Sequence, residues 1–109
     1  MSKGTTNQKL GQIFTHMADL YRINGVAYKP AAYERAAWVL EALSDDVKDL
    51  YEEEGLKGVK KLIGIGERTA LKIEEYVKKE KIVAYEELKK KTALREIITT
   101  YFRSKDISL

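Results

Sequence analysis

The chain has 109 residues, 44% of them hydrophobic, which is enough for the core of one small domain. It contains no cysteine and one histidine, which excludes disulfides and thiolate metal sites and argues against a histidine-based metal site. No apolar run approaches the roughly 20 residues of a membrane span, and no signal-peptide pattern opens the chain. We therefore expect a soluble intracellular protein without a membrane partner, cytoplasmic or in the nucleoid, or nuclear in a eukaryote.

The positive charge is concentrated in the second half of the chain. The net charge is +3, and 13 of the 20 Lys and Arg residues lie in residues 58–109. The excess is mild, but its asymmetry predicts that one face of the molecule meets a polyanion.

Two longer helices are predicted in the first part of the chain. Residues 5–24 carry apolar side chains at spacings of three and four residues, and Gly25 follows as a stop signal. Pro30 then opens a helix over residues 30–43, because proline is favoured in a first helical turn. Tyr33 belongs to the apolar face of this helix, whereas Trp38 points away from it.

Shorter helices are predicted in the middle of the chain. Ser44, followed by two aspartates, is the predicted N-cap of a helix through Tyr51 that Gly55 ends. A short helical piece over residues 56–61 leads into the Gly64-Ile65-Gly66 turn, and a helix over residues 67–79 follows.

A last amphipathic helix is predicted near the C-terminus, with a break near Thr92. Its apolar positions are Leu88, Leu94, Ile97, Ile98, Tyr101 and Phe102. This helix either caps the bundle, which we favour, or docks a partner. No β alternation is sustained anywhere, so we predict an all-α protein. We expect residues 1–109 to form a single domain, a compact bundle of four to six helices.

Two short helical pieces joined by the G-I-G turn form a helix-hairpin-helix pattern. Glycines allow positive φ in such a turn and leave no side chain in the way of a ligand. The free N–H groups and the dipole at the start of the second helix attract phosphate oxygens. The alternative is a plain helix connection with glycine caps, but Lys60, Arg68 and Lys72 around Gly64 and Gly66 favour a phosphate site.

Lys72 is a candidate nucleophile. At about 100° per residue it lies at the border of the apolar face of its helix, one turn after Arg68. Partial desolvation and a neighbouring cation both favour the neutral amine that Schiff-base chemistry requires. Spacing alone favours a simpler interpretation, a flanking lysine whose stem covers apolar surface.

The segments "AAYERAAWVLEAL" and "GLKGVKKLIGIGERTALKIEEYV", with "KEKI" after them, resemble the N-terminal DNA-binding and lyase domain of the family X DNA polymerases. The resemblance covers about residues 8–88 and leaves 89–109 as a C-terminal helical extension. It implies a helical bundle that binds the 5′-phosphate of gapped or nicked DNA in base excision repair. In many members the domain also removes a 5′-deoxyribose phosphate by β-elimination through a lysine Schiff base.

The resemblance also implies roles for individual residues. Lys72 stands at the position of the Schiff-base lysine, and Tyr33 at that of a tyrosine near the lyase pocket. Lys29, Lys60 and Arg68 stand at positions that contact phosphate, beside the turn glycines.

A monovalent cation at the hairpin is a further implication of the resemblance. The backbone carbonyls of Lys60, Leu62 and Ile65 would be its ligands, and the ion would be Na⁺ or K⁺. No cofactor is expected for the chemistry itself. DNA with gaps, nicks or 5′-phosphorylated ends is the expected partner, together with a separate polymerase or ligase.

Three departures from the family pattern concern the lyase chemistry and the hairpin. Leu71 replaces an acidic neighbour found in some relatives, and Ala84 replaces a second lysine. Glu80 replaces a glycine, so a non-glycine residue is expected in a left-handed conformation.

Polymerase activity is not expected of these 109 residues. Neither a second G-x-G nor a D-x-D pair for catalytic Mg²⁺ occurs, so the chain is read as an excised domain or a small stand-alone relative. Three hypotheses stay open. They are a binder of DNA 5′-phosphates, the same binder with Lys72-dependent lyase activity, and a protein-interaction domain that has lost DNA binding.

Overall fold

The computed structural model describes residues 5–105, and the two ends of the predicted 1–109 domain lie outside them. These residues form five helices: α1 Thr5–Ile23, α2 Lys29–Ala42, α3 Val47–Lys60, α4 Glu67–Lys79 and α5 Val83–Ser104. No strand occurs in the described range, and the all-α prediction is confirmed. None of these helices combines the length and apolarity needed to cross a membrane.

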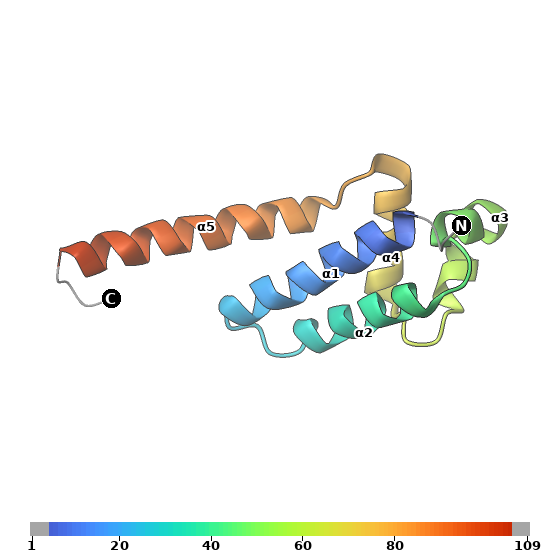
Figure 1. Ribbon diagram of the computed structural model, residues 1–109, viewed down its shortest axis with the longest axis horizontal. Helices are drawn as coiled ribbons and strands as arrows, with labels where there is room; N and C mark the ends of the chain where they lie inside the picture. Colours follow the sequence, from blue (N-terminus) through green and yellow to red (C-terminus); the bar gives the residue numbers. More distant parts are fainter. Residues whose placement is uncertain (1–4, 106–109) are drawn as a thin grey trace.

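The helices α1 and α2 lie side by side as an antiparallel pair, and α4 crosses them (Figure 1). Aromatic rings join the pair: the Phe14 and Tyr33 centroids are 5.4 Å apart, and the Tyr21 ring stacks on Tyr33 at 5.6 Å. The core contains residues of the apolar faces predicted from the sequence, Leu10, Phe14, Met17, Ala36, Leu40, Ala70 and Ile73, and also Val59. Trp38 is 78% exposed, as predicted.

The helix α3 is two helical pieces in succession, because Gly55 interrupts it with φ 68°. The predicted stop at Gly55 is therefore present. The predicted N-cap is wrong: Asp46, not Ser44, holds the extended cap conformation, and its Oδ1 accepts the Lys48 N–H at 2.8 Å. Ser44 stands two residues too early to reach that amide.

The end of α4 has the strain expected from the sequence. Glu80 adopts the left-handed conformation, φ 58° and ψ 25°, which costs a non-glycine residue on the order of 1 kcal/mol. The Glu75 carboxylate then accepts the Val83 N–H at 2.9 Å and so satisfies a free amide at the start of α5.

The predicted break of the last helix near Thr92 is wrong, since α5 is continuous through this position. Thr92 Oγ1 donates to the Leu88 carbonyl one turn earlier, at 2.8 Å. It also accepts a bond from Asn24 Nδ2 at 2.7 Å, which ties α5 to the end of α1. The hydroxyl thus bonds within the helix and across to its neighbour without breaking the helix.

Only the first half of α5 caps the bundle. Leu88 and Thr92 are buried, whereas Leu94, Ile97, Ile98 and Tyr101 are between 43% and 65% exposed. The outer half extends beyond α1 (Figure 1), which gives overall dimensions of 56 × 23 × 22 Å. The radius of gyration, 16.4 Å, accordingly exceeds the roughly 13 Å of a compact domain of this length.

Candidate nucleic-acid interface

The helix-hairpin-helix consists of the second piece of α3, the turn over residues 61–66 and α4. Gly64 has φ +94°, and a Cβ at this position would lie only 2.7 Å from Val39 Cγ2 on α2. Ile65 is buried, and its N–H donates to the Leu62 carbonyl at 3.1 Å. The turn is therefore held against α2 by a close approach that only glycine permits.

Gly66 is the N-cap of α4, with extended φ −82° and ψ 175°. No side chain caps the helix there, and a Cβ at Gly66 would meet only Thr69 Oγ1 at 3.9 Å. The positive φ expected of the turn glycines thus occurs at Gly64 only. Neither conformation nor packing requires glycine at position 66. The absence of a side chain there leaves the free N–H groups in the first turn of α4 accessible to a ligand.

A cavity of about 180 Å³ lies beside this helix start. Four helices contribute to its lining: Tyr21 from α1, Lys29, Ala32 and Tyr33 from α2, Arg68, Thr69 and Lys72 from α4, and Ala84 from α5. The structure thus brings together four of the predicted site residues. Three of the lining residues are cationic and none is acidic.

Tyr21 is a site residue that the sequence analysis did not single out. Its ring stacks on that of Tyr33, with an interplanar angle of 21°, and Lys29 Nζ lies 5.1 Å from the Tyr21 centroid. This cation–π contact holds the Lys29 ammonium at the cavity wall. Tyr21 belongs to the apolar face of α1. The spacing of residues along α1 does not show that this ring borders a cavity, because the other cavity walls come from different helices.

Tyr33 lies between the core and the cavity. It is only 5% exposed, and burial raises its pKa to about 12; Tyr21 adds to the rise and Arg68 opposes it. The group is therefore a neutral phenol near pH 7, able to donate a hydrogen bond but unable to serve as a phenolate base.

Within residues 5–105, the cations of the cavity form no ion pair with an acidic side chain. Lys72 is half-buried and Arg68, one turn earlier, is exposed; neither forms an ion pair or a hydrogen bond with another described residue. Lys60 is also exposed, but it stands at the end of α3 and does not line the cavity. The predicted cationic cluster therefore has two parts, three residues in the cavity and Lys60 on the other side of the turn.

The predicted cation ligands are backbone oxygens of the hairpin turn, from Lys60, Leu62 and Ile65. The Leu62 carbonyl accepts the Ile65 N–H, which leaves its second lone pair for an ion. Carbonyl oxygens of this kind suit Na⁺ or K⁺. Within residues 5–105 no cluster of three or more His, Cys, Asp or Glu side chains could hold a metal ion.

A family model described as a helix-hairpin-helix domain matches residues 5–82, which span α1 to α4. The chain belongs to this helix-hairpin-helix family. None of the curated proteins compared with the chain shows significant similarity to it. Helix-hairpin-helix domains bind DNA, so this membership supports DNA binding by the present chain.

Proposed function

We propose that this helix-hairpin-helix protein binds the 5′-phosphate end of a DNA strand at a gap or nick. The observation that carries the proposal is the cavity formed by Lys29, Arg68 and Lys72 beside the uncapped start of α4. A terminal phosphate carries more charge than an internal one and fits a site with three cations and no carboxylate.

Two further features support this choice of DNA end. The cavity is a partly open depression whose lining residues come from four helices, so its cations converge on one point, which suits a terminal phosphate. The resemblance to the family X polymerase domain suggests the same ligand, a role in base excision repair, and a separate polymerase or ligase as the protein that completes the repair.

The first experiment compares two duplexes with a one-nucleotide gap that differ only in a 5′-phosphate or 5′-hydroxyl on the downstream strand. We expect wild-type protein to prefer the phosphate. Arg68→Ala should lower the affinity for the phosphorylated duplex about 10- to 100-fold, since a hydrogen bond to a charged group contributes about 1.5–3 kcal/mol. Lys48→Ala is the control, because Lys48 lines a different depression with Lys9 and Glu80. Equal affinity for both duplexes would refute 5′-phosphate recognition.

A second function, lyase activity, is favoured by the position of Lys72. Its half-buried side chain lines the cavity that would hold the phosphate of an abasic 5′ end. The amine would attack C1′ of the ring-opened sugar and expel water to form a Schiff base. Loss of a C2′ proton and cleavage of the C3′–O bond would then release the strand with its 5′-phosphate, and water would hydrolyse the imine to free Lys72.

Tyr33 has a limited role in this scheme. As a neutral phenol it can orient the sugar phosphate by donating a hydrogen bond, but it does not accept the C2′ proton near pH 7.

Borohydride reduction tests the lyase function, because it converts a Schiff base into a stable covalent adduct. Wild-type protein should give an adduct with 5′-deoxyribose phosphate DNA, Lys72→Ala should give none, and Arg68→Ala should give less at equal protein concentration. An adduct that persists in Lys72→Ala would assign the nucleophile to another amine.

A further inference from the structure

From Leu88 onward, α5 is strongly basic. Residues 88–105 contain six Lys or Arg residues and one acidic residue, Glu96, whereas Glu86 and Glu87 directly precede them. Lys89 is paired with Glu86 at 3.2 Å. Lys91 and Arg95, in contrast, form no ion pair or hydrogen bond with any described residue, so their charges are available to a ligand.

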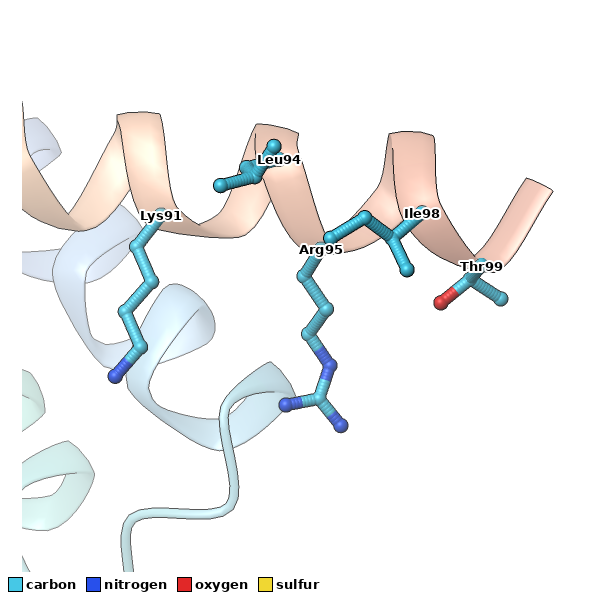
Figure 2. Close-up of a pocket in the computed structure, with 5 residues that line it drawn as sticks. All are labelled: Lys91, Leu94, Arg95, Ile98 and Thr99. Atoms are coloured by element: carbon cyan, nitrogen blue, oxygen red, sulfur yellow. The ribbon is translucent and has the colours of Figure 1, made fainter. Parts of the chain in front are cut away.

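Lys91 and Arg95 lie on the face of α5 that begins at the cavity. They follow Ala84, which lines the cavity, by seven and eleven residues, and these spacings return to the same side of a helix. In Figure 2 both side chains extend from α5 toward the end of α1 and the loop that follows it. That loop leads to Lys29 at the start of α2, which also lines the cavity.

The same side chains line an open depression of about 330 Å³ along α5, with Leu94, Ile98 and Thr99 (Figure 2). Its floor is mostly apolar, from Leu94 and Ile98, and its polar groups are two cations and one hydroxyl, with no carboxylate. Such a surface has the charge and the hydrogen-bond donors that a phosphate backbone requires.

We propose that Lys91 and Arg95 bind backbone phosphates of the DNA strand that leaves the cavity, so that α5 extends the binding site. This inference rests on the proposed function, because it places the 5′-phosphate in the cavity. At 1.5 Å per residue the two positions lie about 10 and 16 Å along α5 from Ala84. Phosphates of one strand follow each other at about 3.4 Å along the duplex axis, so these cations would meet the strand about three to five nucleotides from its end.

The test uses two 5′-phosphorylated single strands, of 2 and 12 nucleotides, as competitors against a fluorescent gapped duplex. The variant Lys91→Ala/Arg95→Ala should bind the 12-mer about tenfold more weakly than wild type, with a salt slope smaller by about 1.4. It should bind the 2-mer unchanged, because that strand ends before Lys91.

A matched control is Lys90→Ala/Arg103→Ala. These two substitutions remove the same charge from the same helix. Lys90 and Arg103, however, point about 100° or more away from the direction shared by Lys91 and Arg95. The control should bind the 12-mer like wild type. Circular dichroism and thermal unfolding establish that both double variants are folded.

Three results would overturn the inference: no loss on the 12-mer, an equal loss in the control, or an equal loss on both strands. Comparison with the Arg68→Ala variant shows whether the α5 contact or the proposed 5′-phosphate site has failed. If Arg68→Ala alone loses affinity, the cavity binds DNA and α5 does not. If the α5 variant alone loses affinity, the contact along α5 stands and the proposed 5′-phosphate site fails.

Discussion

Gly64 and Gly66 stand two residues apart in one turn, yet they are glycines for different reasons. Gly64 has positive φ and touches Val39 on α2, so a side chain there would strain the backbone and displace α2. Gly66 has an ordinary extended conformation, and a Cβ there would make only an ordinary contact with Thr69. Stability therefore depends on the first glycine, and we expect ligand access to depend on the second.

Substitution of the two glycines should separate stability from binding. Gly66→Ser should raise the free energy of unfolding by a few tenths of a kcal/mol, because serine is a good N-cap. Its hydroxyl would also bond the amides proposed to hold phosphate, so affinity for 5′-phosphorylated DNA should fall about tenfold. Denaturant unfolding and fluorescence anisotropy measure the two quantities.

Gly64→Ala is the counterpart and should lower the free energy of unfolding by about 1–3 kcal/mol. Unchanged phosphate affinity in a stabilised Gly66→Ser protein would show that the amides at the start of α4 are not used.

Tyr33 gives the protein a pH dependence at the alkaline end. Its pKa in the folded state, about 12, lies above the ordinary value of 10.0, so the folded state binds this proton more tightly than the unfolded state does. The stabilisation is complete below about pH 10 and is lost as the pH rises toward 12. The difference in unfolding free energy between wild type and Tyr33→Phe should accordingly shrink or change sign over this range, as measured by urea unfolding. A constant difference would contradict the burial of the phenol.

At the scale of the helix, α5 has two halves with different roles. Leu88 and Thr92 pack against α1, and His16 Nδ1 lies 2.6 Å from the Tyr85 hydroxyl in the same contact. Beyond Thr92 four apolar side chains, Leu94, Ile97, Ile98 and Tyr101, are exposed, although their spacing continues the pattern of an amphipathic helix. The contact with α1 therefore ends where α1 itself ends.

Alanine substitutions along α5 test this division. Leu88→Ala should lower the free energy of unfolding by about 2–3 kcal/mol, because it leaves a cavity in the core. Ile97→Ala should change it by no more than about 0.5 kcal/mol, because Ile97 is 65% exposed. A large loss in Ile97→Ala would mean that the outer half is covered in solution, and a dependence on protein concentration would identify a second copy as the cover.

For the whole molecule, the distribution of charge decides between a DNA-binding and a protein-binding domain. The proposed phosphate contacts are six cations: Lys29, Lys60, Arg68, Lys72, Lys91 and Arg95. At about −0.9 per contact, the logarithm of the DNA association constant should fall with that of the salt concentration with a slope of about −5. Anisotropy titrations between 50 and 300 mM KCl would measure it. A slope near zero would favour the protein-interaction hypothesis.

The Na⁺ or K⁺ ion that we propose at the hairpin gives a second prediction for DNA binding. Replacing K⁺ and Na⁺ by a bulky organic cation at the same ionic strength should weaken DNA binding, because the backbone carbonyls proposed as ligands would then lack an ion. Restored affinity on addition of K⁺ alone is the expected control result. Identical affinity in both salts would remove the cation from the site.

The sequence alone determined the helical elements, because apolar spacing, glycine stops and the turn glycines act within a few neighbouring residues. It also located the left-handed residue at Glu80, and it placed Arg68 and Lys72 one turn apart on the helix after the turn. It did not locate the N-cap at Asp46, because neighbouring Ser and Asp residues are all good caps and only the backbone path selects one.

The tertiary structure alone decided how residues far apart in the chain meet. Tyr21, Lys29, Arg68 and Ala84 form one cavity because four helices converge there, and no local pattern links these positions. The same holds for α5, whose apolar spacing is similar in both halves. Periodicity shows which side of a helix is apolar, but only the length and position of α1 determine how much of that side is covered.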